Sequence, residues 1–207
     1  GLDKPLIVQY FVWLWQLLQG NLGYSMKSYE PVSAMIGSHI GPTLLLMGAS
    51  LALSLLIAVP AGIYSAVNQY SKGDYAVVTA SFIGSSIPSF FLALILIYIF
   101  TVKLGILPSG GMNTLGMDGS VADTIRHMVL PVTVLAVSLA GSNIRYIRSS
   151  FLEILQQDYL RTARAKGIGY KRVIWKHAMR NALLPIVTVI GMQIPMLFGG
   201  AVIIEQV

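Results

Sequence analysis

The residues that could carry out chemistry in this chain are few and lie far apart. His39, His127 and His177 form no pair at the spacing that holds a metal ion. Cysteine is absent, which excludes thiolate catalysis, disulfides and cysteine-based metal sites. No glycine-rich phosphate-binding motif ending in Gly-Lys-Ser or Gly-Lys-Thr occurs, so the chain does not bind ATP by that route. The sequence therefore predicts a protein that is not an enzyme and that uses no metal or cofactor.

A second group of polar residues lies inside long apolar stretches. Hydroxyl and amide side chains in such places can line a pathway for a polar solute or form hydrogen bonds between helices. The candidates for lining a pathway are Ser81, Ser85, Ser89, Asn143 and Gln193. They would also suit a passive channel, because a pore needs polar rings. A hydrolase inside the membrane is disfavoured, since no ionisable base lies within these stretches.

The third group is a basic cluster in residues 145–181. It contains nine Lys or Arg residues, and Glu153 and Asp158 are its only acids. The other segments nearly cancel, so the formal net charge of +6 is a property of this one segment. Basic clusters beside apolar stretches more often set membrane topology and contact anionic lipid than bind nucleic acid, and we expect no nucleic-acid partner.

The composition places these groups in a membrane protein. Hydrophobic residues make up 55% of the 207 residues and charged residues only 11%, with a mean hydropathy of +0.72. Soluble domains carry about 25% charged residues, so a water-soluble domain is excluded. About 20 apolar residues cross the hydrocarbon core. We expect four spanning helices, in the charge-free runs 43–67, 76–102, 129–144 and 182–204.

The distribution of basic residues predicts the orientation. With four alternating spans, segments 68–75 and 145–181 share one side and carry ten Lys or Arg residues, against four in segments 1–42 and 103–128. The positive-inside rule puts the richer side in the cytoplasm. We therefore expect an extracytoplasmic segment 1–42, containing a helix with interfacial tryptophans, and a transmembrane domain 43–207 with a cytoplasmic loop 145–181.

The cytoplasmic loop has the pattern of ordered helices. Apolar residues fall at helical spacing between Phe151 and Lys166. Asp158 can cap a helix that starts at the next residue, and Gly167 can end it. A second helix then runs on into the fourth apolar stretch. Such a loop can dock into another protein or lie on anionic lipid, and the spacing alone does not choose between them.

Two motifs of this loop resemble a known family. Tyr-Leu-Arg-Thr-Ala-Arg-Ala-Lys-Gly at 159–167, followed by His-Ala-Met-Arg-Asn-Ala-Leu-Leu-Pro at 177–185, resembles the cytoplasmic loop of ATP-binding-cassette importer permeases. More narrowly, it is similar to the dipeptide and oligopeptide branch, which includes nickel permeases. The family motif begins with Glu-Ala-Ala, and the Arg-Thr-Ala found here is typical of the peptide branch. The resemblance extends through segments 1–5, 20–25 and 149–153. It implies a further helix before residue 1 and another after residue 207, so the chain is expected to be an internal fragment.

The resemblance implies a docking role for loop 151–181. In the family this loop is a coupling helix that sits in a cleft of a cytoplasmic ATPase subunit and carries its closure into the membrane helices. The residues expected to couple to the ATPase are Tyr159, Arg161, Thr162, Ala163, Arg164, Ala165, Lys166 and Gly167. On this hypothesis the basic side chains pair with acceptors on the ATPase, the two alanines permit close approach, and the glycine sets the turn.

The resemblance also implies a fold, a function and partners. These are an all-α polytopic bundle that forms the pathway for di- or oligopeptides in a bacterial or archaeal plasma membrane. The expected partners are a second similar permease, two cytoplasmic ATPase subunits that hydrolyse ATP, an extracytoplasmic substrate-binding protein and the lipid bilayer. An external energy source agrees with four runs that hold no ionisable residue, since proton-coupled carriers usually keep such groups. A passive channel, a non-transporting membrane scaffold, and a transporter of nickel or another small solute remain alternatives.

Overall fold

The computed structural model describes residues 4–114, 116 and 120–205, which divide after Leu45 into two units. In the first unit, helix α1 (Leu6–Leu18) follows Pro5 and ends at Gln19. The helix predicted for the apolar stripe of segment 1–42 is confirmed. α1 contains no charged residue and none of its residues is buried.

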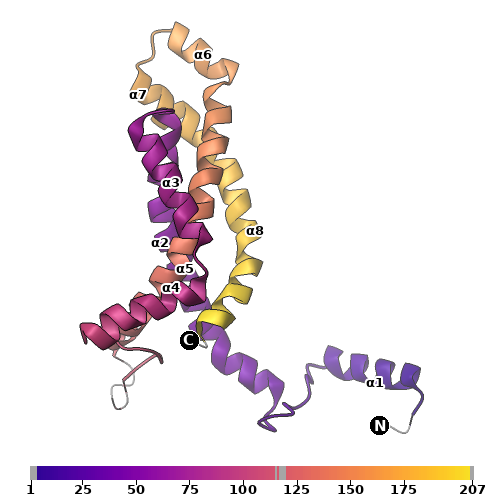
Figure 1. Ribbon diagram of the computed structural model, residues 1–207. Coiled ribbons are helices and arrows are strands. Elements are labelled where there is room, and N and C mark those ends of the chain that lie inside the picture. The colour runs from indigo at the N-terminus through magenta and orange to yellow at the C-terminus, as the bar shows by residue number, and fades with distance from the viewer. Residues whose placement is uncertain (1–3, 115, 117–119, 206–207) are drawn as a thin grey trace. The chain divides into compact units, whose positions relative to one another are not determined.

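The second unit is a helical bundle with a short pair of helices at one end (Figure 1). Its elements are α2 (Val32–Val67, which begins in the first unit), α3 (Lys72–Ser86), α4 (Ser89–Leu96), the π-helical segment η1 (Ile97–Lys103), α5 (Val121–Leu155), α6 (Asp158–Ala165), α7 (Tyr170–Arg172), the π-helical segment η2 (Val173–Ala178) and α8 (Met179–Glu205). The helices α4 and η1 form one continuous rod, as do α7, η2 and α8. No strand occurs among the described residues, so the all-α prediction is confirmed for them.

The second apolar run, residues 76–102, is not a single straight helix. It breaks between Ser86 and Ser89, and the two halves meet at 94°. Pro88 is the cause, because proline cannot donate a backbone hydrogen bond and forces the preceding residue out of the helical region. Ile87 accordingly lies in extended conformation, with φ −76° and ψ 122°. Figure 1 shows α4 turning away from the bundle at this point.

The described residues support fewer membrane spans than the four expected. Two helices, α2 and α5, are long and apolar enough to cross a membrane, and a third crossing is possible if α3 and the α4–η1 rod form one broken span. The short run 129–144 is the centre of α5, a helix of 35 residues. At 1.5 Å per residue α5 is about 52 Å long, well beyond a hydrocarbon core of about 30 Å. Its charged ends therefore extend past the apolar layer. The fourth span stays a prediction.

The main apolar core lies where the bundle meets α6. Its fully buried members include Ala58 of α2, Phe151 of α5, Leu160 of α6 and Val173 of η2. The start of α8 contributes Ala182. Five elements thus share one core, which fixes the loop helices to the ends of the long helices.

α3 and α5 pack closely and run antiparallel. Gly84 of α3 faces Val137, and Gly141 of α5 faces Ser81. Further along, Arg148 reaches Asp74. Along these contacts the residue numbers fall from 84 to 74 in α3 while they rise from 137 to 148 in α5, so the two helices are antiparallel. Small residues at these positions let the two backbones approach, as is common between membrane helices.

Candidate functional site

The first helix predicted for the loop is present as α6, and apolar side chains anchor it. Leu160 is completely buried and Ala163 is 8% exposed, and both belong to the core shared with α2, α5 and η2. These two residues are three apart, so they lie on the same face of the helix. Ala163 therefore packs against this chain's own core, whereas the hypothesis placed it at a partner.

The start of α6 differs from the prediction. The helix begins at Asp158, and Gln157 is the capping residue, without a side-chain cap hydrogen bond. The Asp158 carboxylate instead lies 3.5 Å from the Arg161 guanidinium, in an exposed pair of the kind that contributes about 0–1 kcal/mol. The predicted capping role of Asp158 is wrong.

The end of α6 is a left-handed glycine turn, and the predicted stop at Gly167 is confirmed. Gly167 has φ +78°. Its N–H donates to the carbonyl of Arg164 at 2.9 Å, and the N–H of Ile168 donates to the carbonyl of Ala163 at 3.2 Å. These two bonds define the Schellman motif, which satisfies carbonyls left unpaired at a helix end. The turn sets the direction in which the chain enters α7.

The outward face of α6 is basic and accessible. Apart from Ala163, the predicted coupling residues are exposed: Tyr159, Arg161, Thr162, Arg164, Ala165, Lys166 and Gly167. Two of them are oriented by neighbours. The Tyr159 hydroxyl accepts a hydrogen bond from Asn181 at 2.9 Å, and the Arg164 guanidinium lies 5.7 Å from the centre of the Tyr170 ring. The face thus presents three cations on a helix whose opposite side is fixed.

The helix that follows has the same two-sided character. Val173, Ile174 and Ala178 are buried in the core. The four cations of this segment are exposed: Lys171, Arg172, Lys176 and Arg180. The second helix predicted for the loop is confirmed, and it continues into α8 without a break. The exposed cations of this loop therefore lie on helices that the core holds in place.

Ser81 and Ser85 lie together at the α3–α5 contact. Arg145 of α5 donates through Nη1 to the Ser81 carbonyl at 3.1 Å and to the Ser85 hydroxyl at 2.9 Å. Its guanidinium also lies 4.7 Å from the centre of the Phe82 ring, within the range of a cation–π interaction. Ser81 is only 2% exposed, so in this conformation it faces α5 and lines no open space.

Asn143 and Gln193 form a separate polar group. Asn143 donates through Nδ2 to the Ser54 hydroxyl of α2 at 3.1 Å and accepts a hydrogen bond from the Gln193 side chain of α8. Asn143 is 2% exposed. The Gln193 carbonyl oxygen is buried and has no partner among the described residues. Ser89 belongs to neither group and lies half-buried at the start of α4. The five predicted pathway residues therefore lie in three separate places: Ser81 and Ser85 at the α3–α5 contact, Asn143 and Gln193 in the group with Ser54, and Ser89 at the start of α4.

Sequence reasoning missed a buried ion pair at the opposite end of the α3–α5 contact. The Arg148 guanidinium donates to both carboxylate oxygens of Asp74, through Nε and Nη2, each at 2.8 Å. Asp74 is 2% exposed. The two residues lie 74 positions apart in the sequence, and no local motif connects them. The sequence offered one hint, since Asp74 is an acidic residue in the short segment 68–75, on the side of the membrane predicted to be rich in Lys and Arg.

Comparison with known proteins assigns the chain to a family. The family model described as binding-protein-dependent transport system inner membrane component matches residues 58–207, well over half of the chain. This chain belongs to that family. The inner membrane component family consists of transport components rather than enzymes. The matched region contains α3 to α8 and all of the predicted site residues, whereas Ser54, which pairs with Asn143, lies just before it.

Individual relatives carry transport names. Over its full length the chain is 51% identical to a putative peptide permease protein of Brucella ovis, of which it covers 65%. It is 46% identical to the oligopeptide transport system permease protein AppB of Bacillus subtilis, covering 66%, and 41% identical to the glutathione transport system permease protein GsiC of Pectobacterium atrosepticum, covering 64%. The chain thus spans slightly less than two thirds of these relatives. The predicted resemblance to peptide-type importer permeases is confirmed.

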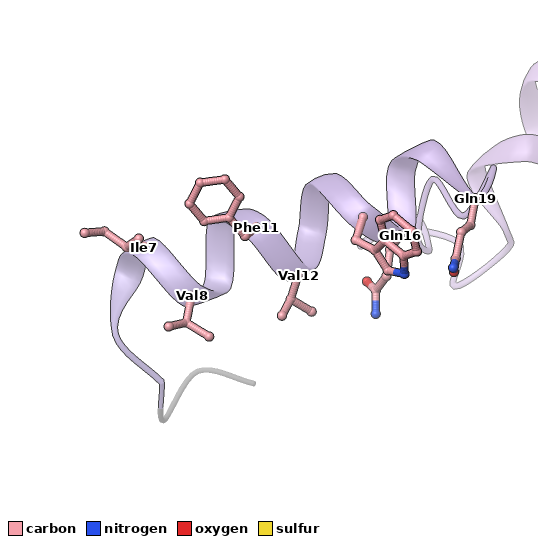
Figure 2. A pocket seen from close by; sticks show the side chains of 7 residues that line it. Ile7, Val8, Phe11, Val12, Gln16 and Gln19 are labelled. Carbon is pink, nitrogen blue, oxygen red and sulfur yellow. The ribbon is translucent and has the colours of Figure 1, made fainter.

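Two further features of the described residues bear on other kinds of site. No group of three or more His, Asp or Glu residues that could hold a metal ion occurs among the residues that the structure describes. A concave stretch of about 500 Å³ lies along α1, lined by Ile7, Val8, Phe11, Val12, Trp15, Gln16 and Gln19 (Figure 2). All of these belong to one helix and its C-terminal residue, so the stretch is a helix surface rather than an enclosed cavity.

Proposed function

We propose that this chain forms the transmembrane subunit of an ATP-driven importer and binds a cytoplasmic ATPase through α6. One observation carries the proposal. α6 is fixed on its inner face by Leu160 and Ala163, and it presents Arg161, Arg164 and Lys166 outward. A helix that only set membrane topology would need charge but no such anchoring.

The shared core explains how docking could drive transport. Leu160 of α6 and Phe151 of α5 are both completely buried in it, together with residues of α2 and α8. Packed interiors are dense and transmit displacement rather than absorb it. A partner that moves α6 therefore moves the ends of the long helices. Alternating access of a pathway needs such a movement.

The remaining parts of the proposal are inferred from membership of the family. ATP is hydrolysed on two cytoplasmic ATPase subunits, a second similar permease completes the membrane bundle, and an extracytoplasmic binding protein delivers the substrate. The membrane is the plasma membrane of a bacterium or archaeon. Loop 145–181 lies in the cytoplasm, and segments 1–42 and 103–128 lie outside.

The substrate class proposed is di- or oligopeptides. Relatives that match the whole chain are named peptide, oligopeptide and glutathione permeases. Amide groups suit peptide backbones, because they both donate and accept hydrogen bonds. Among the five pathway candidates, Gln193 has a carbonyl oxygen without a partner among the described residues, but this oxygen is buried, so it would reach a substrate only in another conformation. Ser81, Ser85, Ser89 and Asn143 remain proposed lining residues for other conformations.

The test is a pull-down of the full-length subunit with its neighbouring ATPase subunits in detergent. Arg164→Glu reverses one exposed charge on α6 and should lower ATPase recovery by about tenfold, the factor for 1.4 kcal/mol. Lys72→Glu is the matched control, because Lys72 is exposed at the start of α3, outside the docking helix. Equal recovery for both variants would refute docking through α6. Failure of the wild type to retain any ATPase would favour a passive channel, which liposome flux measurements would then reveal.

A further inference from the structure

Asp74 is the best-connected buried charge among the described residues. Its two carboxylate oxygens accept both hydrogen bonds from Arg148. Oδ1 also accepts from the Ser65 hydroxyl, and Oδ2 accepts from the Tyr70 N–H at 2.9 Å. Bidentate Arg–carboxylate pairs fix geometry as well as contribute energy. The carboxylate is thus held from three sides.

These bonds join three helices and the turn between two of them. Ser65 belongs to α2, Tyr70 to the turn after it, Asp74 to α3 and Arg148 to α5. Arg148 also donates through Nε to the Ser65 hydroxyl at 3.0 Å. The pair therefore ties the ends of two long helices to the start of α3.

The pair lies directly beside the loop core. Arg148 is three residues before Phe151, which is completely buried in the core that holds Leu160 of α6. Ile147, next to Arg148, belongs to the same core. A displacement of α6 is consequently passed to the end of α5, among the other elements of this core. Among the described residues, the members of this core include none from the far end of α3 or from the α4–η1 rod.

We propose that Asp74 and Arg148 are positioning residues that make α3, and through it α4, follow the movement of the docking loop. The inference rests on the proposed function, because it needs a partner that moves α6. The bidentate geometry restrains α3 against sliding along α5 at the end beside the loop core, while Arg145 makes its hydrogen bonds to Ser81 and Ser85 nearer the far end of α3. Because α3 leads into the 94° break before α4, a shift of α3 changes the position of α4.

The test compares single and paired replacements in the complete transporter, reconstituted with its ATPases in liposomes. Removing Arg148 leaves the buried Asp74 carboxylate without its counter-charge, which is strongly destabilising, and removing Asp74 leaves the half-buried Arg148 unpaired. The informative variant is therefore the double replacement Asp74→Asn with Arg148→Gln, which keeps hydrogen-bonding groups but removes the ion pair. Lys72→Gln is the matched control, because it removes an exposed charge from the same turn.

Two readouts separate positioning from folding. The first is substrate imported per ATP hydrolysed, which should fall at least about fivefold in the double variant, the lower end of typical coupling between sites. ATPase co-purification should stay within about twofold, well under the tenfold step of 1.4 kcal/mol, since α6 is unchanged. The second readout uses Phe91→Cys on α4. Phe91 is 51% exposed and the chain has no native cysteine. ATP should change the labelling rate of this cysteine in the wild-type background but not in the double variant.

Each possible result supports or overturns the positioning role or the proposed function. Unchanged import per ATP in the double variant would overturn the positioning role while leaving the proposed function intact. Loss of assembly in both the double variant and the charge swap (Asp74→Arg with Arg148→Asp) would assign the pair to folding and also overturn it. Partial rescue of import by the charge swap would support the positioning role of the pair. Absence of ATP-driven uptake by the wild type would refute the proposed function itself, and the positioning role with it.

Discussion

Gly141 of α5 lies against the backbone of α3 at Ser81. A Cβ atom at position 141 would come within 2.5 Å of the Ser81 carbonyl oxygen and 3.0 Å of the Ser85 Cβ. Real Cβ atoms do not approach backbone this closely, so any larger residue must push the two helices apart. The contact of α3 with α5 therefore depends on glycine at this position.

Gly141→Ala should destabilise the bundle. Forcing a methyl group into a tight contact typically costs about 1–3 kcal/mol, and here the obstacle is a backbone carbonyl that cannot rotate away. The measurement is the thermal midpoint of the purified full-length subunit in detergent. The matched control is Gly48→Ala in α2, where a Cβ would meet nothing within 4 Å. That change should be neutral or slightly stabilising, because alanine favours helix by up to about 1 kcal/mol. Equal midpoints would contradict the close contact.

Gly167→Ala should weaken ATPase docking without unfolding the bundle. A side chain at φ +78° is strained by about 1–3 kcal/mol, and relief of that strain would open the turn at the end of α6. Gly169→Ala is the control two residues away, since Gly169 has φ −58° and a Cβ there would meet nothing within 4 Å. Co-purification of the ATPase, measured beside the thermal midpoint, tests the difference. Similar recovery with both variants would show that docking does not depend on this turn.

Local features of the fold were predictable from the sequence. Charge-free runs mark the long helices because lipid tolerates no unpaired charge, and Gly167 marks a helix end because glycine adopts φ above zero readily. Pro88 likewise signals a break. The 94° angle at that break depends on packing and could not be derived from the residue alone.

Pairings between distant residues were not predictable from the sequence. The sequence places Asp74 in segment 68–75 and Arg148 in segment 145–181, and nothing in it indicates that they form one buried pair. Asn143 and Ser81 are both predicted pathway residues, although they lie in different contacts. Sequence spacing determines which face of its own helix a residue occupies, but not which other helix covers that face.

Asn143→Leu should destabilise the bundle by about 1–2 kcal/mol, because it removes two hydrogen bonds between helices, each worth roughly 0.6 kcal/mol on average in membranes. The neighbouring Ser54 and Gln193 side chains would be left without that partner. A double-mutant cycle checks the coupling: Gln193→Leu should add little in the Asn143→Leu background. Thr133→Val is the control, since its hydroxyl donates to Val129 within α5. Additive losses would show that the two amides act independently.

Asp123→Ala should release the loop that precedes α5. The Asp123 carboxylate accepts from the Thr114 N–H and, at 2.9 Å, from the Thr114 hydroxyl, and it is 8% exposed. Hydrogen bonds to charged groups contribute about 1.5–3 kcal/mol each, so their loss should raise amide exchange in residues 104–114 by at least about tenfold, the factor for 1.4 kcal/mol. Val121→Ala, at a position 73% exposed in the same first turn, should leave exchange unchanged. Asp123→Asn should fall between the two, because an amide keeps one accepting oxygen but not the charge. Unaltered exchange in Asp123→Ala would mean that other contacts hold this loop in place.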